Sequence, residues 1–199
     1  MGQEVLAAYK KGALKRGATL VFWDEAGFSQ RPSVRRTWAP KGRTPVLRQP
    51  FNWKRLSAVG VVSYAPRGGR VGVLFSLRPG NVDSDWVVSI VRCLRRHIRG
   101  AVVLLWDGLP AHRSTPTVEF LRTQGSWLQV EPLPASAPEL NPVEPMWANL
   151  SARELANLCP ETLGELEHHV RRGVRRIRRD STLGLAFLKH SALFPELSL

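Results

Sequence analysis

The segment Ala101–Trp106, with the sequence AVVLLW, is a continuous run of apolar residues, and it limits the possible folds more than any other feature of the chain. A short apolar run that stops at an Asp-Gly pair is typical of a β-strand whose two faces are both buried. Such a strand lies inside a sheet with helices packed on its faces. We therefore predict an α/β domain built around this strand.

Four further segments favour β-structure, because they are rich in β-branched, aromatic and other apolar residues and are bounded by turn-forming residues. They are Thr19–Phe28, Leu56–Tyr64, Arg70–Leu77 and Trp127–Glu131. The turn sequence Ala65-Pro66-Arg67-Gly68-Gly69 predicts that the second and third of these form a hairpin. Together the five strands predict a mixed sheet, with antiparallel strands first and then strands joined by helical crossovers.

Apolar periodicity and capping residues predict helices between and after these strands. The first three expected helices cover 3–16, the segment from Asn81 or Asp83 to about Arg99, and Thr115–Thr123. A fourth helix is capped by Asn141 and turns Val143, Trp147, Leu150 and Leu158 inward. A long fifth helix starts at Thr162 and turns Leu163, Leu166, Val170, Val174 and Ile177 inward. Thr162 and Glu165 fit a capping box. The resulting division is a basic helix or linker at 1–18, one domain at 19–180 and a C-terminal tail at 181–199.

The charge of the chain indicates a polyanionic partner. The 199 residues carry 29 Lys and Arg against 16 Asp and Glu, a net charge of +13, and the first hundred residues alone hold 19 against 5. An excess of this size on a small domain most often serves nucleic-acid binding. Two cysteines without paired spacing argue against a disulfide scaffold or a zinc ribbon. Neither a membrane-spanning run nor a signal peptide is found, so we expect a cytoplasmic protein without a membrane partner.

Three acidic residues lie at positions that indicate either a structural or a chemical role for the carboxylate. Asp24 interrupts the apolar first strand, Asp107 follows the buried strand, and Glu144 comes three residues after Asn141. Each also has a structural explanation: a strand-end acid paired with an arginine, a turn or helix cap, and a capping-box glutamate, respectively. As a set on separate elements of a basic domain, they would suit divalent cations that activate water or a 3′-hydroxyl at a phosphodiester.

Other chemistries fit the sequence poorly. A tyrosine nucleophile would have to be Tyr9 or Tyr64, and neither has a convincing set of arginines and histidines around it. The sequence has no His-x-His pair, no glycine-rich phosphate loop and no Gly-x-Ser-x-Gly motif. Metal-dependent phosphodiester chemistry is therefore the favoured interpretation.

Three stretches, VFWDEAGF, LLWDGLPAHRS and LPASAPELNPVEPMW, resemble in this order the three acidic motifs of DDE transposases with an RNase H-like fold. The similarity is greatest to the mariner superfamily, in its bacterial insertion sequence 630 branch. The third stretch is the most specific, with a proline-rich approach to a glutamate and a trailing tryptophan. The residues that carry this match are Pro134, Pro138, Leu140, Asn141, Pro142, Glu144 and Trp147.

The resemblance implies a mixed five-stranded RNase H-like sheet flanked by helices, with Asp24, Asp107 and Glu144 as the catalytic residues that bind two Mg²⁺ or Mn²⁺ ions. His112 and Asn141 would support them. The implied reaction is hydrolysis of DNA at transposon ends, followed by strand transfer of the 3′-hydroxyl into target DNA at a TA dinucleotide. The implied partners are DNA, a second copy of the chain on DNA and an upstream helix-turn-helix protein. The implied location is the nucleoid of a bacterial cell.

Two basic segments could contact the DNA backbone. Arg31–Arg55 holds eight positive charges interleaved with Trp38, Phe51 and Trp53, a mixture that suits phosphate contact and base stacking. The predicted DNA-binding residues there are Arg35, Arg36, Lys41, Arg43, Arg48, Lys54 and Arg55. A β-hairpin with solvated arginines is the alternative. Arg171–Arg179 holds six arginines in nine residues, and its alternative is a solvated helix face.

Two other functions remain open from the sequence. One is a truncated remnant that keeps the fold and the DNA affinity but does not cut, because Met1 begins about twenty residues before the first acidic stretch. The other is an RNase H-like nuclease that cuts DNA without strand transfer.

Overall fold

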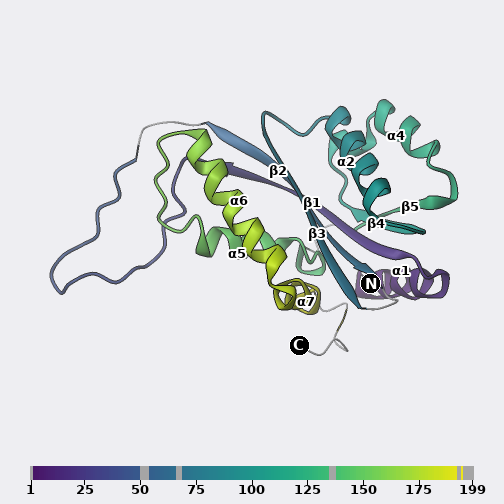
Figure 1. Ribbon diagram of the computed structural model, residues 1–199, viewed down its shortest axis with the longest axis horizontal. Helices are drawn as coiled ribbons and strands as arrows, with labels where there is room; N and C mark the ends of the chain where they lie inside the picture. Colours follow the sequence, from purple (N-terminus) through teal and green to yellow (C-terminus); the bar gives the residue numbers. More distant parts are fainter. Residues whose placement is uncertain (1, 50–53, 66–68, 135–137, 192–193, 195–199) are drawn as a thin grey trace.

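A five-stranded mixed sheet forms the centre of the protein in the computed structural model, which describes residues 2–49, 54–65, 69–134, 138–191 and 194 (Figure 1). The strands are β1 Thr19–Ser29, β2 Arg55–Ala65, β3 Arg70–Pro79, β4 Val102–Trp106 and β5 Leu128–Pro132. Their order across the sheet is β3-β2-β1-β4-β5. The first three strands pair antiparallel, and β4 and β5 run parallel to β1. The predicted mixed sheet and its hairpin are confirmed, although turn residues 66–68 lie outside the described part.

The apolar run at 101–106 forms the buried strand that its sequence predicts. All five residues of β4 are buried, and so are the first five residues of β1. These strands are neighbours in the middle of the sheet, where side chains on both faces are covered. Asp24 and Asp107 lie where this apolar pattern ends, at the sixth residue of β1 and directly after β4.

Helices cover both faces of the sheet (Figure 1). The helices are α1 Gly2–Arg16, α2 Ser84–His97, α3 Pro110–Arg113, α4 Thr115–Arg122, α5 Glu144–Arg153, α6 Leu163–Arg179 and α7 Ser181–His190, with short 3₁₀ turns η1 Gly125–Trp127 and η2 Pro138–Leu140. One core cluster joins the sheet to α1, α5, α6 and α7, and the other joins it to α2 and α4. The expected helices therefore form close to their predicted positions.

Helix α5 begins later than the sequence predicts. Asn141 is not its N-cap: the cap residue is Val143, Glu144 is the first helical residue, and the helix ends before Leu158. The side chain of Asn141 turns inward instead. Its amide donates to the carbonyl of Trp23 at 3.4 Å, and its Oδ1 accepts from the Val143 N–H at 3.1 Å. A tertiary contact to β1 therefore replaces the expected capping box.

Helix α6 begins as its sequence predicts. Thr162 is the N-cap, and its hydroxyl accepts from the Glu165 N–H at 3.1 Å. Four of its five expected apolar residues are buried, namely Leu166, Val170, Val174 and Ile177. The segment at 181–199, expected as a C-terminal tail, contains α7, whose Phe187 and Leu188 are buried in the core.

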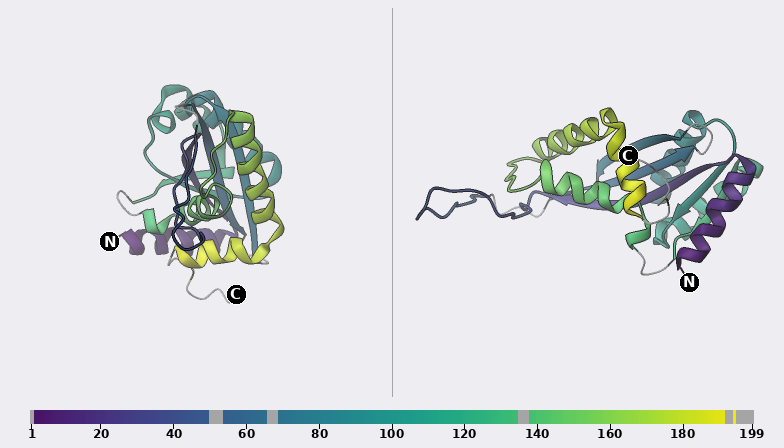
Figure 2. Two further views of the ribbon diagram at one scale, coloured as in Figure 1. Left: turned by 90° about the vertical axis from the view of Figure 1, so that its left-hand side faces the viewer. Right: turned by 90° about the horizontal axis from the view of Figure 1, so that it is seen from below.

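A long basic arm, defined here as residues 34–49, extends away from the sheet (Figure 2). Every residue of the arm is exposed, and Trp38 is 100% exposed. Within residues 31–49 the only β-pairing is the single bridge from Ser33 to Ala156, so the hairpin alternative does not hold for the described part of this segment. Phe51 and Trp53, expected to stack on bases, lie outside the described residues.

The described helices include none that is both long and apolar enough to span a bilayer.

Candidate functional site

The three acids singled out by the sequence line one cleft of about 410 Å³. Asp24 comes from β1, Asp107 from the end of β4, and Glu144 from the first turn of α5. The remaining lining is Trp106, Gly108, His112, Arg113, Val130, Pro132, Leu133, Pro134, Pro138 and Asn141. Three elements whose acids are up to 120 residues apart in the chain thus line the same cleft.

Asp24 is held on the sheet by a tryptophan from α5. The Trp147 indole Nε1 donates to Asp24 Oδ2 at 2.8 Å. The ring can lie there because Gly60, the partner of Asp24 on β2, has no side chain: a Cβ at this position would come within 2.5 Å of the Trp147 ring. Burial raises the pKa of the Asp24 carboxyl to about 7, and the negative charges of Glu144 and Glu25 add to the rise, against the Trp147 hydrogen bond.

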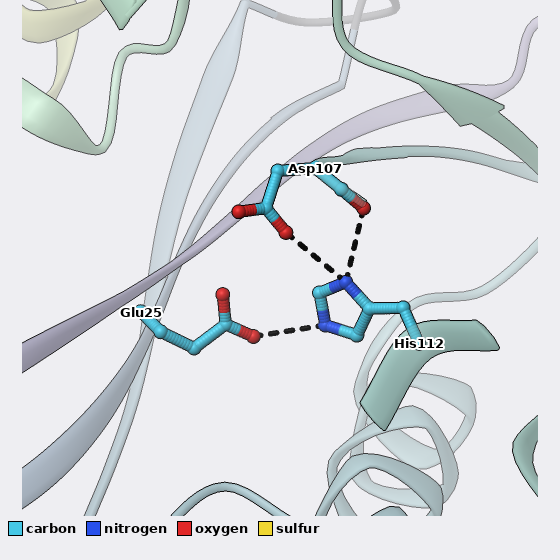
Figure 3. Close-up of side chains that lie close together, drawn as sticks. All are labelled: Glu25, Asp107 and His112. Atoms are coloured by element: carbon cyan, nitrogen blue, oxygen red, sulfur yellow. Dashed lines mark hydrogen bonds and ion pairs between the residues drawn. The ribbon is translucent and has the colours of Figure 1, made fainter. Parts of the chain in front are cut away.

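Asp107 is held in a different way, by a histidine that also binds Glu25 (Figure 3). His112 Nδ1 lies 3.2 Å from Asp107 Oδ1 and 3.1 Å from the Asp107 carbonyl oxygen, and His112 Nε2 lies 2.9 Å from Glu25 Oε1. Asp107 Oδ1 also accepts from the Leu109 N–H at 3.0 Å. The His112 hydrogen bond lowers the pKa of the Asp107 carboxyl, the Leu109 N–H and the charge of Arg113 assist, and burial opposes the shift.

His112 is enclosed by aromatic rings and is only 3% exposed. Its imidazole stacks on the Trp106 ring, with centroids 4.0 Å apart, and meets the edge of Trp23 at 5.9 Å. Burial lowers the pKa of His112, but the hydrogen bonds to Asp107 and Glu25 outweigh burial and raise this pKa to about 9. With this pKa the imidazole is protonated at neutral pH and donates from both nitrogens to two carboxylates.

The ligand atoms of Glu25, Asp107 and His112 all lie within 4.8 Å of one another, a spacing that a metal ion could use. A protonated imidazole has no free lone pair, however, and the carboxylate–imidazolium contacts already balance much of the charge of the three groups. A metal ion could instead bind on the other side of Asp107, where the cleft also holds Asp24 and Glu144, although the ligand atoms of these three acids are more widely spaced than 4.8 Å.

Glu144 enters the cleft from the exposed start of α5. The preceding Asn141 is buried, and its two hydrogen bonds join the start of α5 to Trp23, the residue before Asp24. This contact fixes the approach of α5 to β1. Carboxylate oxygens at such a site are the ligands that Mg²⁺ and Mn²⁺ prefer.

The predicted DNA-binding residues are not part of the cleft. Arg35, Arg36, Lys41, Arg43, Arg48, Lys54 and Arg55 are all exposed. The first five belong to the basic arm, and Arg55 starts β2, where its guanidinium donates to Asn81 at 3.4 Å. The base of the arm is attached to the body, since the Arg35 N–H donates to Asn157 Oδ1 at 2.8 Å and Gln30 binds the carbonyls of Pro160 and Glu161.

Three residues of the site are not assigned to it by the sequence alone. Glu25 is visible there only as the acid beside Asp24 in the first acidic stretch, and Arg113 carries no signal of its own. Trp147 is expected as a core residue and as the trailing tryptophan of the third stretch, without a contact to Asp24. Alternation along β1 could have shown that Asp24 and Glu25 point to opposite faces of the sheet. Nothing in the local sequence indicates that Glu25 meets a histidine 87 residues away.

Comparison with known proteins identifies the family of the chain and solved structures with a similar fold. The family described as DDE superfamily endonuclease matches residues 19–167. Among solved structures, the Mos1 mariner paired-end complex with Mn aligns with a TM-score of 0.65 and 20% identity over 98% of this chain and 57% of that chain. The catalytic domain of Mos1 mariner transposase aligns with a TM-score of 0.58 and 17% identity over 98% of this chain and 85% of that chain.

These structures confirm the expected RNase H-like fold. The chain spans a little over half the length of the Mos1 chains in the paired-end complexes. No curated protein matches the chain by sequence.

Proposed function

Because the chain belongs to the DDE superfamily of endonucleases, we propose that it is the catalytic domain of a transposase, that it cuts DNA at transposon ends and that it joins the freed 3′-hydroxyl to TA target sites. The observation that carries the proposal is the single cleft shared by Asp24, Asp107 and Glu144. The resemblance of the acidic motifs to the bacterial insertion sequence 630 branch supports the finer assignment. It also supports a bacterial, nucleoid-associated protein whose catalytic domain covers residues 19–180.

The cleft fits divalent cations. Three carboxylates line the cleft against two cationic side chains, His112 and Arg113, and the raised pKa of Asp24 reflects burial and a repulsion that a bound cation would relieve. Two Mg²⁺ or Mn²⁺ ions, when bound, would activate a water or a 3′-hydroxyl and stabilise the leaving oxygen of the phosphodiester. Asp24, Asp107 and Glu144 would hold them. Mos1 complexes with Mn and with Mg support this choice of metals.

The other residues of the site position these ligands. His112, fixed between two tryptophans and Glu25, holds the Asp107 carboxylate. Asn141 holds the start of α5 against β1, and Trp147 holds the Asp24 carboxylate. The carboxylate oxygens would then be oriented before the substrate binds. Such preorganisation lowers the free energy needed to reach the transition state.

DNA is the proposed substrate, and the basic arm is its proposed contact outside the cleft. The exposed arginines and lysines would neutralise phosphates, and the fully exposed Trp38 ring could stack on an unpaired base. Two Mos1 structures, a paired-end complex with the left transposon end and a strand transfer complex, support such a partner. A second copy of the chain on DNA and an upstream helix-turn-helix protein complete the proposed assembly.

The test is cleavage of a labelled transposon-end duplex in Mg²⁺ or Mn²⁺, with the helix-turn-helix partner supplied where the element encodes one. We expect the wild type to cut at the transposon end and to join it to a plasmid at TA sites. We expect Asp107→Asn to abolish both steps, because the change removes a charge from the metal site and keeps the size of the side chain. The matched control is Glu139→Gln, since Glu139 is an exposed acid on η2 that does not line the cleft.

The products distinguish the alternatives. Cutting without any joined product would favour a nuclease, and DNA binding without cutting would favour a truncated remnant. Wild-type cleavage by Asp107→Asn would overturn the assignment of the cleft.

A separate test addresses the arm. Replacing Arg35, Arg36, Lys41 and Arg43 with alanine should weaken binding of a duplex. It should also flatten the dependence of log K on log salt by about 0.9 for each phosphate that the arm no longer neutralises. Affinity that barely changes between low and physiological salt in the wild type would contradict the electrostatic account.

A further inference from the structure

The outer face of α6 carries more positive charge than the fold requires. Three of its six arginines have partners: Arg171 binds Glu167 at 2.6 Å, Arg176 binds Glu154 at 2.7 Å, and Arg178 donates to a carbonyl of β3 at 3.1 Å. The other three are Arg172, Arg175 and Arg179. All three are exposed, and none has a hydrogen bond or an ion pair with any residue that the structure describes.

These three arginines form one row, here called the α6 row. Successive residues of an α-helix are about 100° apart, so positions 172, 175 and 179 fall within about 60° of one another. The buried residues Leu166, Val170, Val174 and Ile177 lie on the opposite side of the helix. The α6 row therefore points straight outward and extends for about 10 Å along the helix axis.

The spacing of the α6 row is unfavourable in the free protein. Arg172 and Arg175 are three residues apart, and Arg175 and Arg179 are four apart, so like charges are neighbours on the helix surface. The acids of α6, Glu165 and Glu167, lie nearer its start, and Glu167 is already paired with Arg171. A row of cations that repel one another, with the acids of their own helix at its far end, is stabilised by a polyanion.

The α6 row is also rigidly joined to the candidate active site. Arg176 binds both Glu154 and Asn149, and a Cβ at Gly173 would come within 2.4 Å of the Leu150 side chain, so α6 packs closely on α5, the helix that carries Glu144. The start of α6 lies beside the base of the basic arm, as Figure 1 shows, and Gln30 donates to the carbonyl of Glu161 at 2.9 Å. The arm therefore meets the start of α6, whereas the α6 row lies towards the other end of the helix, beyond Glu165 and Glu167.

We infer that the α6 row is a second DNA-contact surface, which binds the phosphate backbone of a duplex without reading its sequence. This inference rests on the proposed function for its choice of DNA as the polyanion. Duplex DNA carries one negative charge per about 1.7 Å of its axis, so a row of three guanidinium groups about 10 Å long faces several phosphates at once. Arginine suits this contact, because its planar fork pairs with two phosphate oxygens.

The experiment measures binding of a fluorescent duplex of about 30 base pairs and arbitrary sequence to the full chain in EDTA, between about 50 and 200 mM salt. The test variant is Arg172→Gln/Arg175→Gln/Arg179→Gln. The matched control is Lys11→Gln/Lys15→Gln/Arg16→Gln, which removes the same charge from exposed positions on α1. Far-ultraviolet circular dichroism checks that both variants fold.

We expect the α6 variant to bind at least about tenfold more weakly than the control at low salt, and its salt slope to fall by about 2 to 3. Equal affinity and equal slope for the two variants would overturn the inference while leaving the proposed function intact. A wild type that binds no duplex at any salt would overturn both. Loss of helical signal in the α6 variant alone would show that the row is structural and would also overturn the inference.

Discussion

Asp24 and Asp107, the two acids of the cleft that belong to or follow strands, differ in how the neighbouring groups stabilise the charge of the carboxylate. Asp24 lies within β1 and is bound by neutral donors, the Trp147 indole and the Glu25 backbone N–H, with the negative charges of Glu144 and Glu25 nearby. Asp107 follows β4 and is bound by a backbone N–H and by the His112 imidazolium. Burial and repulsion raise the pKa of Asp24 to about 7, whereas the hydrogen bond from His112 lowers the pKa of Asp107.

The difference indicates that the neighbouring groups stabilise the charge of Asp107 but not that of Asp24. Asp107 is charged and oriented by its own neighbours. Asp24 has an unfavourable charge that an external cation would stabilise. A cluster of like charges alone would predict that neutralising Asp107 leaves the metal-free protein as stable or slightly more stable. The lowered pKa of Asp107 argues against that expectation, and the repulsion acts on Asp24 instead.

Among variants that keep all three acids of the cleft, the largest expected effect comes from removing the support of Asp107. Glu25→Gln and His112→Gln should each lower cleavage by about 10- to 100-fold and raise the metal concentration needed for half-maximal cleavage, because both residues orient a ligand without being one. The control is Glu119→Gln, an exposed acid on α4. Metal-titrated cleavage assays give both readouts.

A purely structural role for the Glu25–His112 contact would give a different pattern. The variants would then melt at lower temperature, but the surviving folded fraction would need no more metal than the wild type. An unchanged metal requirement would therefore contradict the positioning role of His112 and Glu25.

How far the sequence could predict this site depends on the distance over which each signal acts. The apolar run at 101–106 and the acid that ends it are local, and they correctly place Asp107 at the end of a buried strand. The start of α5 depends on Asn141, whose side chain could cap the helix or bind β1. The hydrogen bond to Trp23, 118 residues away, decides the outcome.

The Glu25–His112 contact is of the same long-range kind. His112 sits on a helix of four residues, and its neighbours in sequence do not reveal that Trp106 and Trp23 enclose it. By contrast, the whole of α6 could be predicted, because its cap, Thr162, and its apolar period are contained in the helix itself. Local patterns therefore give the elements, and only the packing gives the partners of each charge.

The next expected effect is on stability, in opposite directions for the two acids. Asp24→Asn should stabilise the metal-free protein at pH 8 by roughly 1–3 kcal/mol, because it removes a buried and repelled charge and can still accept the Trp147 hydrogen bond. Asp107→Asn should destabilise it by less than about 1 kcal/mol, since the side chain of Asp107 is 52% exposed and solvent screens its ion pair. Urea denaturation in EDTA measures both free energies of unfolding. If both variants shift stability in the same direction, the contrast between the two acids is wrong.

The smallest expected effect is the pH dependence of the difference in free energy of unfolding between each of these variants and the wild type. The folded pKa of Asp24, about 7, lies above its unfolded value of about 3.9, so the folded state holds a proton that the unfolded state has lost between these values. The stability associated with the protonated Asp24 is therefore complete below about pH 4 and is lost as the pH rises towards 7.

Because asparagine does not titrate, the difference in free energy of unfolding between Asp24→Asn and the wild type should increase from pH 5 to pH 7. Above pH 7 this difference should level off towards a constant value. The pKa of Asp107 is lowered in the folded state, so its contribution is present above about pH 4 and is lost only as the pH falls further. The corresponding difference for Asp107→Asn should therefore stay nearly constant from pH 5 to pH 7, where His112 is protonated in the folded protein. Urea titrations of the three proteins at pH 5, 6, 7 and 8 in EDTA make the comparison. A difference for Asp24→Asn that does not change with pH would mean that Asp24 is already ionised without strain in the free protein, and the cleft would then need no cation to balance it.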